Sequence, residues 1–274
     1  RDCSDTARRS WSDARRREQP MALHETITDG VATVVMDNPP VNALGIADTY
    51  ALADLLDSYG NRADVRSVIL TAEGHGFCAG VDIKEIQALP GNEGILGANR
   101  SCLRVFRSVY ECAVPVVAAV NGFCLGSGIG LVGNADVIVA AEGAAFGLPE
   151  VDNGALGAAT HLMRLVPAHR ARWMLLSCEP ASAEELHDFG SVLRVVTPDA
   201  LQEAAKEVAG VLAAKDPTVL RAAKASLNGI DPVDVHRSYR FEQGFTFELN
   251  LAGAGDEARE AFLRGDRDPD ATAD

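Results

Sequence analysis

The stretch PVVAAVNGFCLGSGIG, residues 115–130, decides the fold of this chain together with two shorter stretches, FGLPE at 146–150 and GALGAATH at 154–161. The apolar run at 116–120 is typical of a buried strand, and it leads into a glycine turn and the start of a helix. About twenty residues later, Glu150 stands in a mostly apolar setting. This order suits a site where backbone N–H groups hold a carbonyl oxygen while one acid or base moves a proton.

A second stretch has the same form as the first. Residues 77–84, FCAGVDIK, follow an apolar run at 65–71 and turn through Gly80 into a short helix that Asp82 is expected to cap. Each turn can present a free backbone N–H at the start of a helix, so two facing turns would bracket one oxygen. The alternative is that the glycines only allow tight packing of strand on helix.

The six residues GIGLVG at 128–133 match the dinucleotide-binding pattern G-x-G-x-x-G. In a dinucleotide-binding unit the first glycine follows the strand almost at once, and a full helix precedes the next strand. Here residues 121–127 intervene, and the next strand is expected from Asp136. We therefore expect no nicotinamide cofactor, and since no metal-binding motif is present, no metal.

The rest of the chain predicts an α/β core followed by a helical C-terminal part. Strands are expected at 26–28, 31–36, 65–71, 116–120 and 136–140, and helices at 46–59, 99–112, 128–134, 158–165, 168–176, 182–188, 199–214, 217–228 and 233–251, with a flexible connection at 90–97. Residues 1–20 are dense in charge without apolar periodicity and are expected to be a disordered or non-native tail. The expected core is 21–210, and the helical region is 211–274.

Composition excludes several classes of partner. The chain of 274 residues has a formal net charge of −14, so neither nucleic acid nor a membrane is an expected partner. Its six cysteines form no C-x-x-C pair, which predicts buried reduced thiols in a cytoplasmic protein.

Among single residues, Glu150 is the candidate acid or base, because apolar neighbours raise the pKa of a carboxyl group. A salt-bridged surface glutamate is the alternative. His161 could reach a pocket or could simply be packed at a helix start, and Asp136 is expected to satisfy loop backbone. Lys84 and Arg104 are candidates for binding a phosphate group, but the simpler interpretation is that both are solvated surface charges.

Residues 22–265 resemble the crotonase superfamily, the enoyl-CoA hydratase/isomerase family, through the stretches 77–84 and 118–136. The resemblance implies repeated ββα turns in a spiral, C-terminal helices that complete a homotrimer or dimer of trimers, and an acyl-CoA substrate. Coenzyme A would be part of the substrate, with no other cofactor. By position, Val81 and Ser127 would supply the oxyanion-hole N–H groups, and Glu150 would be catalytic. The residues implied to bind CoA or substrate are Val41 and Ala79 near the adenine, and Val81, Asp82, Ile83, Lys84 and Ser127 along the pocket.

Two positions depart from the hydratases of this family. Gly130 stands where they carry a second glutamate, and Ser127 replaces a usual glycine. Further likeness in 110–115, 128–132, 147–151, 154–161 and 242–250 is to family members that open a ring of a cyclic β-diketo acyl-CoA by C–C hydrolysis in steroid breakdown. This reaction is our leading hypothesis. Two alternatives remain. The chain could be an enoyl-CoA hydratase or isomerase, with Glu248 or another residue replacing the lost glutamate, or a non-catalytic acyl-CoA binder.

Overall fold

The computed structural model describes residues 21–265, and within this range ten strands form two sheets. The larger sheet has the order β1 (Ala22–Thr28), β2 (Val31–Asp37), β3 (Ser67–Ala72), β5 (Val116–Val120), β7 (Val137–Ala141), β10 (Arg194–Val196). Its first pair is an antiparallel hairpin, and every other pair is parallel. The smaller sheet has the order β4 (Gly76–Cys78), β6 (Phe123–Leu125), β8 (Ala145–Gly147), β9 (Ala181–Ser182).

The chain alternates between the two sheets, and this alternation produces the spiral. Strands β3, β5 and β7 of the larger sheet lead to β4, β6 and β8 of the smaller one. Helices follow each pair: α3 (Ile83–Ala88) and α4 (Glu93–Tyr110), then α5 (Ser127–Val132), then α6 (Ala159–Leu162). Repeated ββα turns are therefore present, and the expected fold is confirmed.

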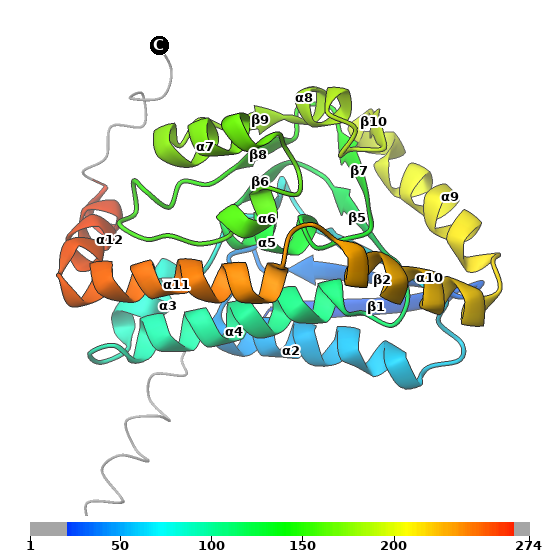
Figure 1. Cartoon of the computed structure of the whole chain (residues 1–274), viewed down its shortest axis with the longest axis horizontal. Coiled ribbons are helices and arrows are strands. Elements are labelled where there is room, and N and C mark those ends of the chain that lie inside the picture. Colours follow the sequence, from blue (N-terminus) through cyan, green and yellow to red (C-terminus); the bar gives the residue numbers. More distant parts are fainter. Residues whose placement is uncertain (1–20, 266–274) are drawn as a thin grey trace, which may run out of the picture.

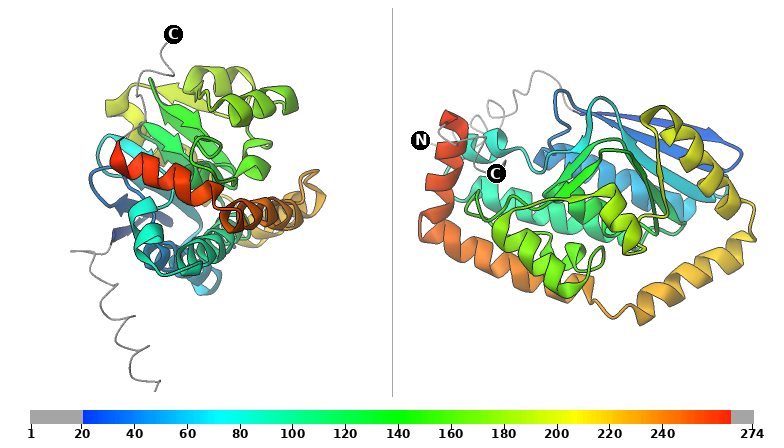
Figure 2. Two further views of the ribbon diagram at one scale, coloured as in Figure 1. Left: turned by 90° about the vertical axis from the view of Figure 1, so that its left-hand side faces the viewer. Right: turned by 90° about the horizontal axis from the view of Figure 1, so that it is seen from above.

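The other helices pack around this core. They are α2 (Ile46–Ser58), α7 (Ala168–Ser177), α8 (Ala183–Asp188), α9 (Leu201–Ala213), α10 (Pro217–Ile230), α11 (Val235–Leu251) and α12 (Ala254–Arg264), with single 3₁₀ turns at Tyr59–Asn61 and Pro198–Ala200. Helix α11 lies along α4, and α4 lies along α2 (Figure 1). In Figure 2 the C-terminal helices α10 to α12 run along the outside of the core.

The larger sheet is covered on both faces, which explains why β5 and β7 are apolar throughout and why β3 contains only two polar residues, Ser67 and Thr71, both buried. Val68 and Leu70 of β3 point into the main core, which also contains buried side chains of α2 and α4. Ile69, between them, points to the opposite face and packs with Val117, Val139 and α9. This alternation follows from the two-residue period of a strand.

Asp136 ties this sheet to the C-terminal helices. Its Oδ2 accepts a hydrogen bond of 2.7 Å from the N–H of Val116 and lies 2.6 Å from Nζ of Lys224, a lysine that is 5% exposed. Asp136 therefore satisfies a backbone group, as expected, but the group lies at the start of β5 and not in a loop.

Two sequence predictions need correction. Residues 90–97 do not form a flexible connection, because α4 begins at Glu93. Gly94 permits close packing instead, since a Cβ there would lie 2.1 Å from the carbonyl oxygen of Ile86. Strands β4, β6 and β8 were not predicted, because three residues are too few for a periodic pattern to be recognised.

The limits of the expected domains are placed as follows. The predicted tail at 1–20 lies outside the described residues, and so does 266–274 at the end of the expected helical region. The expected boundary between 210 and 211 falls inside α9. In the part of the chain that is described, no helix has the length and apolar character needed to cross a membrane.

Candidate active site

The two glycine turns face each other in the structure. The first runs from β4 to α3 through Gly80, and the second runs from β6 to α5 through Gly126. Both glycines have positive φ angles, +104° and +56°, which side chains with a Cβ rarely adopt. A Cβ on Gly126 would lie 3.2 Å from the Cα of Gly80, so only glycine lets the turns approach this closely.

Each turn leaves one N–H group available to a ligand. Leu44 donates to the carbonyl oxygen of Gly80 at 2.8 Å and accepts from the N–H of Asp82 at 2.9 Å. Because these bonds flank Val81, the N–H of Val81 points away from Leu44. Ser127 is the first residue of α5, where an N–H has no partner within the helix. Val81 and Ser127 therefore stand where two donors can meet one oxygen.

Cys78 connects the two turns, a role that sequence reasoning missed. Its Sγ accepts from the N–H of Gly80 at 3.4 Å and lies 3.8 Å from Oγ of Ser127. The thiol is fully buried, and burial raises its pKa to about 11. A thiol with so high a pKa is a poor nucleophile, so Cys78 has a structural role here.

Glu150 lies beside the second turn. Its Oε1 would lie 2.9 Å from a Cβ on Gly126, so the carboxyl group reaches the glycine itself. Its Oε2 is buried and has no hydrogen-bond partner within the described residues. Burial raises the pKa of Glu150 to about 8, and the nearby charge of Glu242 adds to the rise. Glu150 can therefore exchange a proton near neutral pH.

A cavity of about 80 Å³ brings these groups together. Its lining includes one residue from each turn, the carboxyl group, and side chains of α4 and α11: Val81, Ser127, Glu150, Asn99, Cys102, Phe106 and Tyr239. Among the described residues that line it, Glu150 is the only carboxylate.

The position without the second carboxylate is filled. A Cβ on Gly130 would lie 2.1 to 2.4 Å from three ring atoms of Phe106, and this phenylalanine is 2% exposed. The aromatic ring therefore occupies the space that a side chain at position 130 would need.

His161 packs behind the wall of the cavity and does not line it. It is 1% exposed, with its ring 4.9 Å from that of Phe106 and 5.1 Å from that of Tyr239. Both ring nitrogens lack partners among the described residues, and burial lowers the pKa of His161 to about 3. The ring is therefore neutral at physiological pH.

Glu248 lies apart from the cavity. It is exposed on α11 and lines neither this cavity nor the larger one described below. The structure thus offers it no contact with Glu150 through either space.

The residues implied to bind CoA, apart from Ser127 on the second turn, lie on or beside the first turn. The N–H of Ala79 donates to the carbonyl oxygen of Val41 at 3.1 Å, so these two residues are adjacent. Asp82 caps α3 as expected, since its Oδ1 accepts from the N–H groups of Lys84 and Glu85. Ile83 begins α3, and the side chain of Lys84 is exposed.

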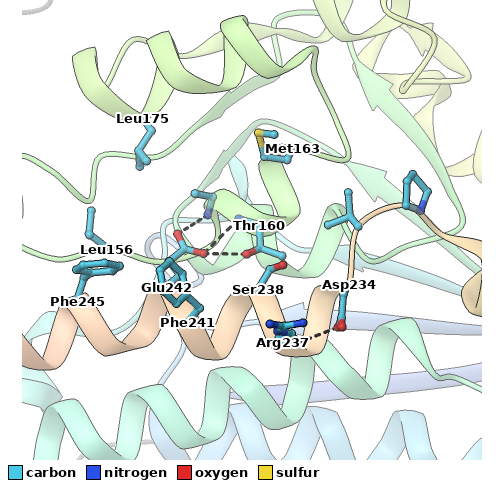
Figure 3. Close-up of a pocket in the computed structure, with 13 residues that line it drawn as sticks. Leu156, Thr160, Met163, Leu175, Asp234, Arg237, Ser238, Phe241, Glu242 and Phe245 are labelled. Carbon is cyan, nitrogen blue, oxygen red and sulfur yellow. Dashed lines mark hydrogen bonds between the residues drawn. The ribbon is translucent and has the colours of Figure 1, made fainter.

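A second, larger cavity of about 840 Å³ opens between α11 and the segment from Leu156 to Leu175. Figure 3 shows Glu242 extending from α11 toward Thr160. Its carboxylate accepts from the N–H of Ala159 at 2.8 Å and from the N–H and Oγ1 of Thr160, both at 3.2 Å. Glu242 thus fixes the start of α6 by hydrogen bonds, and its negative charge raises the pKa of Glu150.

Sequence reasoning singled out neither Phe106, Tyr239, Asn99 nor the role of Glu242. The first three belong to long amphipathic helices, where a residue facing a cavity has the same pattern as a core residue. The sequence pointed only to Glu242, because this residue begins the stretch 242–250 that resembles the ring-opening members of the family. No group of three or more His, Cys, Asp or Glu side chains within 21–265 is arranged to hold a metal ion.

Comparison with known proteins agrees with this geometry. The family model for enoyl-CoA hydratase/isomerase matches residues 26–245. The chain is 57% identical over 235 residues to the (7aS)-7a-methyl-1,5-dioxo-2,3,5,6,7,7a-hexahydro-1H-indene-carboxyl-CoA hydrolase of Rhodococcus jostii (strain RHA1), covering 86% of this chain and 91% of the relative. It is 58% identical to the protein of the same name from Mycobacterium tuberculosis, covering 86% and 95%.

The fold is also similar to solved structures. A crystal structure of an enoyl-CoA hydratase/isomerase from Xanthobacter autotrophicus Py2 superimposes with a TM-score of 0.81 at 27% identity, covering 90% of this chain and 93% of that one. On the match of the family model and of these relatives, this chain belongs to the enoyl-CoA hydratase/isomerase family, the crotonase superfamily.

Proposed function

We propose that this protein hydrolyses a C–C bond in the ring of a cyclic β-diketo acyl-CoA thioester, a ring-opening step of steroid degradation. The observation that carries the proposal is the cavity with a single carboxylate, Glu150, in which Phe106 fills the space at Gly130. The two relatives named above, both hydrolases of a dioxo-indene-carboxyl-CoA, support the choice of substrate.

One carboxylate is sufficient for this reaction. Glu150 accepts a proton from water as the water oxygen bonds to the carbon of a ring ketone. The tetrahedral intermediate then collapses to a carboxyl group as the adjacent C–C bond breaks. The electron pair of that bond passes to the thioester as an enolate, which the N–H groups of Val81 and Ser127 stabilise. The proton on Glu150 returns to carbon, so the net change is the addition of one water.

The ordinary hydratase reaction fits the site less well. Hydration of an enoyl thioester in this family uses two carboxylates around one water, and the described lining of the cavity contains one. The non-catalytic binder also fits poorly. Oε2 of the buried Glu150 has no hydrogen-bond partner among the described residues, which reduces stability, and binding of CoA does not require such a group.

We extend the proposal to assembly and location. The protein would form a trimer or dimer of trimers and act in the cytoplasm, with no cofactor beyond the CoA of its substrate. The large apolar side chains exposed on α10 and α11 support association, among them Leu227 (63%), Ile230 (74%) and Phe241 (71%). Five free, buried cysteines among the described residues are consistent with a reducing compartment.

The test is turnover of the dioxo-indene-carboxyl-CoA thioester in water enriched in oxygen-18. Mass spectrometry should detect a product heavier by one water, with the label in a new carboxyl group. Crotonyl-CoA serves as the comparison substrate. Absence of the labelled product together with rapid hydration of crotonyl-CoA would contradict the proposal and favour the hydratase.

A further inference from the structure

Asn99 of α4 lines the cavity that contains Glu150, and its side-chain amide carries a hydrogen-bond donor with no partner among the described residues. The residue is 8% exposed, and its Nδ2 is buried without a hydrogen-bond partner among the described residues. Oε2 of Glu150, on the same cavity, is the corresponding unpartnered acceptor. Buried polar groups in folded proteins are nearly always hydrogen-bonded, so a donor and an acceptor left over in one cavity point to a ligand.

The side-chain amide of Asn99 does not hold the helices together. The contact between α4 and α11 uses the backbone carbonyl of Asn99, which accepts from Nε2 of Gln243 at 2.7 Å. Gln243 is itself fixed, since its Oε1 accepts from Arg240 at 2.8 Å. Because the backbone makes this contact, replacing the side chain leaves it in place.

The surroundings of Asn99 make its amide selective for an oxygen. Apolar side chains of Ile86, Ile95 and Ala98 line the cavity with it. Beside these apolar side chains, an N–H donor without a partner stabilises a carbonyl oxygen of the ligand and gives no comparable stabilisation to a hydrocarbon ring. A neutral amide also binds more strongly as that oxygen gains negative charge, without adding a charge beside Glu150.

We propose that Nδ2 of Asn99 donates a hydrogen bond to the oxygen of the ring ketone that water attacks. This assignment rests on the proposed function and adds a third donor to those of Val81 and Ser127, which hold the thioester oxygen. Glu150 takes the proton of the water, and the electron pair of the ketone C=O moves onto the oxygen that Asn99 holds. Asn99 thus selects acyl groups with a carbonyl oxygen at this place.

Binding of an unreactive pair of thioesters tests the assignment without any turnover. The pair is 4-oxocyclohexanecarboxyl-CoA and cyclohexanecarboxyl-CoA, which differ by the ring carbonyl. Cleavage of a C–C bond beside a 4-oxo group does not give a thioester enolate, so the proposed reaction opens neither ring. Calorimetry on the wild-type protein should show a preference of about tenfold or more for the oxo compound. Asn99→Leu, which keeps the branched shape of the side chain, and Asn99→Ala should both lose the preference for the oxo compound, while both variants still bind cyclohexanecarboxyl-CoA.

A control variant and a stability measurement separate this role from a structural one. Ser101→Ala changes another buried polar residue of α4 that does not line the cavity, and its preference should be that of the wild type. Asn99→Leu should melt at the same or a higher temperature, since it removes an unpartnered donor and leucine favours helix. Equal wild-type affinities for the two thioesters, or a wild-type preference in Asn99→Leu, would overturn the assignment.

Kinetics then separates the assignment from the proposed function. If the wild-type protein opens the dioxo substrate, Asn99→Leu should lower kcat/KM about 10²-fold or more, the usual effect of one donor to a developing oxyanion. Unchanged kcat/KM overturns the assignment and leaves the ring-opening function intact. If the wild-type protein opens no ring, the proposed function fails, and the binding preference still decides whether Asn99 recognises a carbonyl.

Discussion

The ring of Phe106 occupies the space beside Gly130, where a Cβ would lie 2.1 Å from its Cζ. Gly130 lies inside α5 and Phe106 inside α4, so the relationship is a packed contact between two helices. The loss of the second carboxylate therefore involves two positions: the glycine at 130 and the phenylalanine at 106 that packs against it. Restoring it would require a change in both helices.

We expect Gly130→Glu to destabilise the protein and to gain no hydration of crotonyl-CoA. Inserting a side chain into filled space usually costs about 1–3 kcal/mol or more, so the melting temperature should fall. Combining it with Phe106→Ala should recover part of this loss. Gly210→Ala is the control, since nothing lies within 4 Å of a Cβ there, and it should fold normally. A stable single variant that hydrates crotonyl-CoA rapidly would show that Phe106 moves aside.

Glu150→Gln should keep the fold and the affinity for CoA but lower turnover by about 10²–10⁴. Glutamine preserves the size of the side chain and removes its ability to accept a proton from water. Steady-state kinetics with the dioxo substrate and calorimetry with CoA measure the two effects. Turnover close to that of the wild type would remove Glu150 from the mechanism.

The rate should rise with pH through about 8, the raised pKa of Glu150. A general base must be ionised, so kcat/KM should fall below this pH as the carboxyl group gains its proton. A profile of kcat/KM from pH 5.5 to 9.5 measures this. A rate that is flat down to pH 6 would mean that Glu150 is ionised there or is not the base.

Stability of Glu150→Gln relative to the wild type should also increase with pH. Folding raises the pKa of Glu150 from 4.5 to about 8, so the unfolded chain loses this proton at lower pH than the folded protein. The wild type therefore loses stability between these values, and the variant does not. Urea unfolding at pH 5 and pH 8.5 should show the variant gaining at least about 1 kcal/mol over the wild type. A constant difference would contradict the burial of this carboxyl group in solution.

We expect the protein to be a trimer or a dimer of trimers in solution. Phe241 and Phe245 of α11 are 71% and 42% exposed and contact each other edge to face at 5.3 Å. Light scattering at micromolar concentration should give the mass of an oligomer, and Phe241→Asp should shift it toward the monomer. A monomeric mass for the wild-type protein would contradict the predicted trimer and show that Phe241 and Phe245 do not form a subunit interface.

The sequence by itself determined the features that depend on neighbouring residues. Apolar runs predicted the strands at 65–71 and 116–120, and the glycines after them predicted turns into helices, because these signals lie within a few residues of each other. The apolar setting of Glu150 indicated a raised pKa, and the structure agrees. The spacing of the two turns and of Glu150 carried the resemblance to the family.

Only the tertiary structure decided how distant segments meet. The short strands β4, β6 and β8 exist because they pair with one another across the spiral. Gly80 faces Gly126, and Phe106 fills the space at Gly130, because chain segments more than twenty residues apart pack together. The pattern of a helix distinguishes buried from exposed positions, but it does not tell which buried position faces a cavity. For that reason the position of Asn99 in the lining of the Glu150 cavity could be recognised only from the tertiary structure.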